Sequence, residues 1–228
     1  MSEDFFEPPP APEPQPEPEP RTLPPWVGAP RGTLPGVVAL ELVIAQTDQV
    51  AVCITRLGAY PTGFEFVLRT VATPDQDELD IDPLLFGPHR HRRRHHGSEP
   101  GLPDDMLRFG VQFSDGSKAT NTGGLHHLDE PPTGPVMHPG GGSGGGGDWR
   151  QDNWVWPLPP PGPLLFVCEW PAMGIALSRA EIDAQLVIDA ASRAQALFPN
   201  SGEPRTRGSG SISYAPLQRR SDQPTDEP

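Results

Sequence analysis

The segment DWRQDNWVW, which ends at Trp156, contains the residues best suited to ligand binding. Trp154 and Trp156 are two positions apart, so on a β-strand their side chains share a face with those of Arg150 and Asp152. Two indoles flanked by a cation and an anion would form a stacking platform for a sugar or a peptide. Large aromatic side chains in β-proteins are more often core residues, because they bury a large apolar area. The pattern therefore favours buried tryptophans and leaves the platform as the alternative.

Histidines gather in the run HRHRRRHH, which contains His89, His91, His95 and His96. Imidazole binds zinc and nickel, but a specific site needs ligands fixed in space, and the neighbouring arginines repel a cation. We expect weak adventitious metal binding by these histidines and no functional metal site. The run follows an acidic stretch. The basic run is most simply a solvated stretch of charge, and the alternative is that it contacts an acidic partner.

Catalytic motifs with a defined spacing are missing from the sequence. It has no G-x-S-x-G, H-E-x-x-H, C-x-x-C or G-x-x-x-x-G-K-[ST] pattern, and the run Gly140 to Gly147 lacks the lysine of a phosphate-binding loop. Glu169 is the one acid within an apolar strand pattern, and alternation places it opposite Phe166 and Cys168, toward solvent. We therefore expect a protein that is not an enzyme and needs no cofactor. Because a catalytic triad requires no sequence adjacency, a hydrolase remains the third hypothesis.

Charge and composition restrict the partners. The net charge of −13 disfavours nucleic-acid binding, which needs a basic surface. The longest apolar run, Gly36 to Ala45, is interrupted by Glu41 and is about half the length of a bilayer-spanning helix, so we expect no membrane anchor. The N-terminus resembles no secretory signal. Cys53 and Cys168 lie in apolar strand patterns and are expected as buried free thiols rather than a disulfide. These features predict a cytoplasmic protein whose partner is another protein, in an oligomeric state that stays open.

Segments rich in proline or glycine separate the foldable parts of the chain, because its 33 prolines and 25 glycines are unevenly spread. The N-terminal part alternates proline with glutamate and cannot bury a core, so Trp26 is expected to be a stray aromatic in a disordered arm. Loops rich in charge, proline or glycine interrupt the foldable part. The expected organisation is a disordered arm at 1–34, one domain at 35–198 with a disordered insertion at 73–103 and a Gly-rich loop at 122–148, and a disordered tail at 199–228.

Alternating apolar residues predict the strands. Three such runs follow one another between residues 36 and 72, and a fourth, MLRFGVQF, precedes an Asp115-Gly116 pair typical of a two-residue hairpin. RQDNWVW and LLFVCEW add two strands, separated by a proline-rich connector. The inward-facing residues of the first four runs are expected to be Val38, Leu40, Leu42, Ile44, Val50, Val52, Ile54, Phe64, Phe66, Leu68, Leu107, Phe109, Val111 and Phe113. We predict a mainly β fold, an antiparallel β-sandwich-like domain of seven or eight strands.

One segment predicts a helix. Ser178 and Glu181 match a capping box, and apolar residues from Ile182 onward recur at helical spacing until Pro199. Because the apolar residues form one stripe, this C-terminal amphipathic helix should pack on the sheet, with Leu186 in the contact.

The string DWRQDNWVWPLPPPGPLLFVCEWPAMGI follows the glycine run directly. Together with GVVALELV and AYPTGFEF, it resembles a group of uncharacterised proteins from GC-rich Gram-positive bacteria. The likeness covers residues 36–198. It supports the architecture and implies no catalytic residues.

The sequence thus favours a non-catalytic protein-interaction or assembly module. An acidic, proline-rich arm suits recruitment of basic or aromatic-lined surfaces. A small-ligand or carbohydrate-binding β-sandwich that uses Trp154, Trp156, Arg150 and Asp152 is the alternative.

Overall fold

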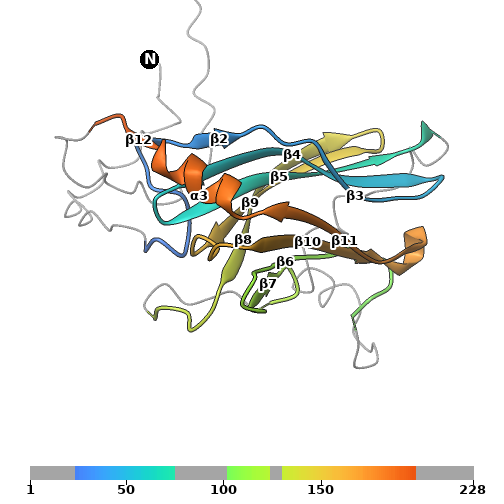
Figure 1. Cartoon of the computed structure of the whole chain (residues 1–228). Coiled ribbons are helices and arrows are strands. Elements are labelled where there is room, and N and C mark those ends of the chain that lie inside the picture. The colour runs from blue at the N-terminus through green and yellow to red at the C-terminus, as the bar shows by residue number, and fades with distance from the viewer. Residues whose placement is uncertain (1–23, 75–101, 124–129, 199–228) are drawn as a thin grey trace, which may run out of the picture. The chain divides into compact units, whose positions relative to one another are not determined.

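The computed structural model describes residues 24–74, 102–123 and 130–198 (Figure 1). This part is mainly β, with antiparallel sheets and one α-helix. Its elements are β1 (Thr33–Leu34), β2 (Gly36–Val38), β3 (Leu42–Gln46), β4 (Val50–Tyr60), β5 (Gly63–Ala72), β6 (Arg108–Gln112), β7 (Lys118–Thr120), β8 (Val136–Gly145), β9 (Asp148–Trp156), β10 (Pro163–Trp170), the short 3-10 helix η2 (Pro171–Met173), β11 (Ile175–Asp183), α3 (Gln185–Ser192) and β12 (Gln195–Ala196). No helix in these three ranges is long and apolar enough to cross a membrane.

Two main sheets contain these strands. The larger sheet has the order β2-β4-β5-β9-β8, and β3 also pairs with β4. The smaller sheet has the order β11-β10-β6-β7, while β1 and β12 form a separate pair. The proline-rich connector predicted between residues 157 and 163 therefore carries the chain from the larger sheet to the smaller one.

Side chains from both sheets form one hydrophobic core. Phe66 of β5 lies 5.5 Å from Phe109 of β6 and 5.4 Å from Phe166 of β10, between ring centroids. The predicted inward faces of β4, β5 and β6 are confirmed, because their apolar residues are buried. The hairpin at Asp115-Gly116 is confirmed as well, since β6 pairs with β7. The first predicted strand is instead broken into β2 and β3, with Leu40 and Leu42 half-buried.

The predicted helix is wrong in its start and in its packing face. Ser178 and Glu181 lie in β11, where Cys168 faces Ser178 and Leu165 faces Glu181 across the β10 ladder. The Ser178 hydroxyl donates to the carbonyl of Ala176, at 2.8 Å, rather than capping a helix. Ladder bonds to β10 outweigh the local helix signal there. The helix forms only at Gln185–Ser192 and is followed by β12, so it is not the last element.

Helix α3 packs through small residues. Val187, Ala190 and Ala191 are its buried residues, whereas Leu186 is 48% exposed, against the prediction. The helix contacts β2 and β4 (Figure 1). At Gly36 a Cβ atom would overlap the carbonyl oxygen of Ala190. Glycine at position 36 therefore allows the helix backbone to lie directly on β2.

The Gly-rich loop predicted at 122–148 is also wrong over its second half. Gly140 to Gly145 belong to β8, and β9 begins at Asp148. Gly146 and Gly147 make the turn with φ of 55° and 76°, the backbone that a tight hairpin needs. A Cβ on Gly142 or Gly144 would come within 2.7 Å of the Trp149 ring. The glycines thus make room for this indole, so the run is a paired strand rather than a floppy loop.

The prediction of a disordered arm at 1–34 is wrong for residues 24–34, the part of it that the structure describes. Pro24 to Val27 form a turn, with the Val27 N–H donating to the carbonyl of Pro24 at 3.0 Å. Residues Thr33 and Leu34 pair with β12. Residues 1–23, 75–101, 124–129 and 199–228, and with them His89, His91, His95 and His96, lie outside the described residues.

Candidate functional site

The four residues singled out from the sequence lie on β9 and share its outer face, the face turned away from the core. Arg150 and Asp152 are exposed, Trp156 is half-buried, and Trp154 is only 6% exposed. The shared face follows from the alternation of the strand. Val155 points the other way, into the core. The prediction of buried tryptophans is thus correct for Trp154 and not for Trp156, and neither residue belongs to the main core.

Beside these residues the outer face is hollowed. The hollow, of about 670 Å³, extends over β4, β5, β9 and β8. Gly141 of β8 has no side chain to fill it, and a Cβ atom there would meet nothing within 4 Å. We call it the outer hollow. Its lining residues are Thr55, Arg56, Val67, Arg69, Gly141, Gly142, Ser143, Arg150 and Asp152.

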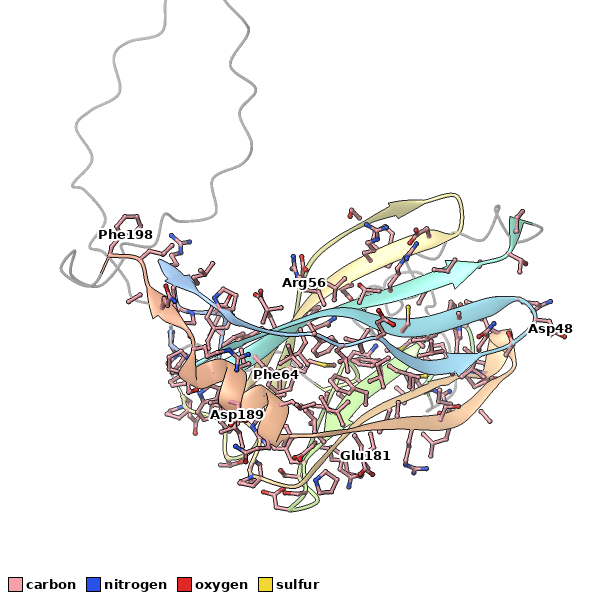
Figure 2. The ribbon with its side chains drawn as sticks, turned by 45° about the horizontal axis from the view of Figure 1, so that its top comes forward. Asp48, Arg56, Phe64, Glu181, Asp189 and Phe198 are labelled. Atoms are coloured by element: carbon pink, nitrogen blue, oxygen red, sulfur yellow. The ribbon has the colours of Figure 1, made fainter. Side chains whose placement is uncertain are left out.

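Alternating charges connect the strands across the outer hollow. Arg56 Nη2 lies 2.9 Å from Asp152 Oδ1, and Figure 2 labels Arg56 next to the β8–β9 hairpin. Arg69 binds Asp148 through both Nε, at 2.9 Å, and Nη2, at 2.5 Å. Arg150 lies farther from the same carboxylate, at 3.5 Å, and its side chain is 56% exposed. Arg150 is therefore the most weakly paired of these three guanidinium groups and the best placed to bind a ligand.

The ion pairs and burial shift the pKa values of the groups in this network. The hydrogen bond from Arg69 holds the pKa of Asp148 below its ordinary value, although partial desolvation opposes the shift. The same pair raises the pKa of Arg69. Cys53 lies nearby on β4, with its thiol 3.6 Å from the Arg69 carbonyl. Burial raises the pKa of this thiol and Arg69 partly offsets the rise, so Cys53 is a weaker nucleophile than an ordinary exposed thiol.

Aromatic residues adjoin the outer hollow at the end of β9. Trp154 packs edge-on against Tyr60, at 5.7 Å, and Trp156 against Trp26, at 6.1 Å, between ring centroids. We call these four residues the outer aromatic cluster. The Trp154 indole N–H donates to the carbonyl of Pro25, at 3.1 Å. The turn at residues 24–27 therefore covers the other members of the cluster. Trp154, which is 6% exposed, has no free face on which a sugar could stack.

Tyr60 is the titratable member of this cluster. Burial, together with the charge of the Glu65 carboxylate and a hydrogen bond to it, raises the pKa of Tyr60 to about 12. The hydroxyl is thus protonated at neutral pH and serves as a hydrogen-bond donor rather than a base.

A second, smaller hollow of about 260 Å³ lies over the smaller sheet. Arg108 spans part of it, at 2.6 Å from the Glu169 carboxylate and 2.9 Å from the Leu102 carbonyl. Glu169 is therefore on the outer face, as predicted, where it forms a cross-strand ion pair. This arrangement connects β6 to β10 and to the segment before β6.

Neither the thiols nor the metal-binding residue types form a further site in the described part of the chain. Cys53 and Cys168 are free, and burial raises the pKa of Cys168 to about 12. Within ranges 24–74, 102–123 and 130–198, no group of three His, Cys, Asp or Glu residues could hold a metal ion.

Sequence reasoning missed Arg56, Arg69, Asp148 and the turn at residues 24–27. Alternation of β5 already placed Arg69 outward. Arg56 faces outward only because β4 has a register shift between Ile54 and Arg56, which no local pattern indicates.

Comparison of the chain with models of protein families, with curated proteins and with solved structures found no match. The resemblance noted from the sequence therefore remains a hypothesis.

Proposed function

We propose that this chain is a non-catalytic protein-interaction module that binds an extended segment of a partner protein along the edge strand β8. Strand β8 is at the end of the larger sheet, and in the described part of the chain it pairs with β9 alone. An edge strand presents backbone N–H and C=O groups that a further strand can bind. This open edge is the observation that carries the proposal.

The composition of β8 supports an accessible edge. Natural edge strands are usually protected by lysines, prolines or bulges. Strand β8 has Pro139 and a register shift before Gly142, but Gly142 to Gly145 pair regularly with β9. Apart from Ser143, these residues have no side chain, and all four are exposed. An incoming strand would meet little steric resistance along this half of β8.

The outer hollow supplies specificity beside that edge. A strand added to β8 would place alternate side chains over the same face that bears Arg150 and Ser143. Arg150, being the most weakly paired guanidinium group there, suits an acidic or amide side chain of the partner. Backbone pairing would then give affinity, and the hollow would select the sequence.

A rigid scaffold is part of this proposal. We propose that the two sheets pack face to face as a β-sandwich. The aromatic contacts of Phe66 with Phe109 and Phe166 support this arrangement. We also place the module in the cytoplasm, and the free thiols Cys53 and Cys168 support a reducing compartment.

Site-specific photo-crosslinking in the native cells tests the proposal. A photoreactive residue at Ser143, on β8, should give a discrete adduct whose partner peptide is an extended segment. The matched controls are Glu181 on β11 and Asp48 in the β3–β4 turn, both exposed and labelled in Figure 2. Adducts of equal yield from all three positions, or none from Ser143, would contradict edge-strand binding.

Binding of a small polar ligand is the second candidate. The volume of the outer hollow, about 670 Å³, lies within the range of ligand pockets, roughly 300–1,000 Å³. Arg150 and Asp152 would orient such a ligand, whereas Trp154 is covered and would not stack on it. Calorimetric titration with sugars and small carboxylates, repeated on Arg150→Ser, separates this candidate from the first. Saturable binding that depends on Arg150 would favour it.

A further inference from the structure

The turn at residues 24–27 contacts the larger sheet as a peptide ligand contacts its receptor. Trp26 inserts edge-on against Trp156, at 6.1 Å between ring centroids. The carbonyl of Pro25 accepts a hydrogen bond of 3.1 Å from the Trp154 indole. The turn closes on itself through the Val27 N–H and the Pro24 carbonyl. A compact Pro-Pro-Trp unit thus presents one aromatic ring and one carbonyl to the sheet.

The surface beneath this turn is built by the sheet itself. Tyr60 and Trp154 are each 6% exposed, and Val136, which faces Trp156 across the ladder, is 1% exposed. At Gly63 a Cβ would come within 2.7 Å of the Trp154 ring, so this glycine lets the indole lie against β5. None of these residues belongs to the main core. They form a separate apolar patch on the outer face.

The attachment of the turn to the rest of the chain suits local opening. Gly28 and Gly32 flank the connection between the turn and β1, and Gly32 has φ of 68°. The pairing of β1 with β12 involves only two residues on each strand. Segments held by few contacts open at a lower free energy than the whole domain unfolds. We therefore expect that the turn can leave the apolar patch without unfolding of the sheet.

Aromatic side chains with an indole N–H are the groups that recognise proline-containing peptides, because they pack on the proline rings and bind a carbonyl. We propose that the apolar patch formed by Tyr60, Val136, Trp154 and Trp156 is a peptide-binding site, specific for a Pro-Pro-aromatic turn of a partner protein. Residues 24–27 occupy this site in cis and compete with that partner. The site contacts only the first residue of β8, Val136, whereas strand addition is proposed along Gly142 to Gly145, so the two proposals can be tested separately.

Competition gives a direct test on the full chain. A labelled peptide with the sequence of residues 21–29, RTLPPWVGA, is titrated by fluorescence anisotropy into wild type and into Trp26→Ala. The tethered turn has a high effective concentration, so removal of its ring should tighten peptide binding by about tenfold or more. The same peptide with its tryptophan changed to alanine should not bind. Trp156→Ala in the Trp26→Ala background should abolish binding as well. Absence of saturable binding to folded Trp26→Ala would overturn the proposal.

Hydrogen exchange of indole N–H groups tests the same idea on the unaltered protein, should Trp26→Ala not fold. Trp170 is the matched internal control, because its indole donates to the Asp105 carbonyl at the same distance, 3.1 Å, within the main core. Local opening predicts that the Trp154 indole exchanges about 100-fold faster than that of Trp170, and with little dependence on denaturant. Equal rates for the two indoles would mean that the turn is released only by global unfolding, against the proposal.

A second copy of the chain is the rival occupant. Exchange of the turn between two copies would make wild type dimeric at micromolar concentration and Trp26→Ala monomeric, as measured by sedimentation velocity. That result would assign the apolar patch to self-association and overturn the partner stated above. A wild-type chain that is monomeric under these conditions supports a foreign peptide.

Discussion

Arg69 and Asp148 form a two-point ion pair across neighbouring strands, with Nε 2.9 Å from Oδ1 and Nη2 2.5 Å from Oδ2. Arg69 lies on β5 and Asp148 begins β9, so the pair fixes the hairpin β8–β9 against the rest of the larger sheet. Both side chains are about one-third exposed, at 33% and 35%. Solvent therefore screens the interaction in part, and its contribution is that of a well-aligned surface pair, up to about 1 kcal/mol.

This pair predicts a pH-dependent stability. The pKa of Asp148 is lowered in the folded protein, so the unfolded chain binds its proton at higher pH than the folded chain does. The stabilisation is therefore complete at pH values above the ordinary pKa of 3.8 and is lost as the pH falls through the pKa of Asp148 in the folded protein.

Asp148→Asn should lower the free energy of unfolding at neutral pH by about 1 kcal/mol. The difference from wild type should shrink toward about pH 2. Urea denaturation at both pH values measures it, with Asp48→Asn, in an exposed turn, as the control. A deficit that persists unchanged at low pH would contradict the ion-pair account.

The glycine run in β8 makes a second prediction. Gly142→Ala should cost about 1–3 kcal/mol, because the new methyl group would collide with the Trp149 ring. Gly141→Ala is the matched control, since a Cβ there meets nothing within 4 Å. Thermal unfolding of the two variants compares them. A floppy linker would tolerate both substitutions equally, and equal melting temperatures would rule out the paired strand.

Helix α3 makes the third prediction. Val187 is fully buried and Leu186 is 48% exposed. Val187→Ala should therefore lower the free energy of unfolding by about 2 kcal/mol, while the neighbouring Leu186→Ala should change it by no more than about 0.5 kcal/mol. Chemical denaturation followed by circular dichroism measures both. A larger loss from Leu186→Ala than from Val187→Ala would show that the helix packs through its other face.

The fourth prediction concerns the thiols. Cys168 is 1% exposed and burial raises its pKa to about 12, whereas Cys53 is half-buried on the outer face. A thiol reagent at neutral pH should label Cys53 in the folded protein and reach Cys168 only as fast as the domain unfolds. The variant Cys53→Ser isolates the slow reaction for kinetic measurement. Rapid labelling of Cys168 in that folded variant would contradict its position in the core.

Local sequence patterns were sufficient to predict most of the strands. Val52, Phe66 and Val111 each belong to a series of large apolar residues spaced two apart, and residues at that spacing share one face of a strand. The Asp115-Gly116 turn is equally local. These features could therefore be predicted residue by residue.

The errors arose where distant residues decide the structure. Ser178 and Glu181 match a capping box, but pairing with β10 draws them into β11. The glycines of β8 suggest flexibility, but the Trp149 ring packs on them. The contact between Pro25 and Trp154 joins residues 129 positions apart, and no pattern within the arm indicates it. In the candidate site Arg150 and Asp152 were predicted, whereas Arg56 required the register shift in β4.

If a partner protein binds along β8 and over the outer hollow, its recovery with the chain should depend on Arg150. The protein is purified from its native cells as wild type, as Arg150→Ser and as Arg179→Ser, and the associated proteins are quantified by mass spectrometry. Arg179 is the matched control, because it is an exposed arginine on β11 beside the smaller hollow. We predict a partner that is recovered with wild type and with Arg179→Ser, and about tenfold less with Arg150→Ser. Equal recovery with both variants, or a loss confined to Arg179→Ser, would contradict the account.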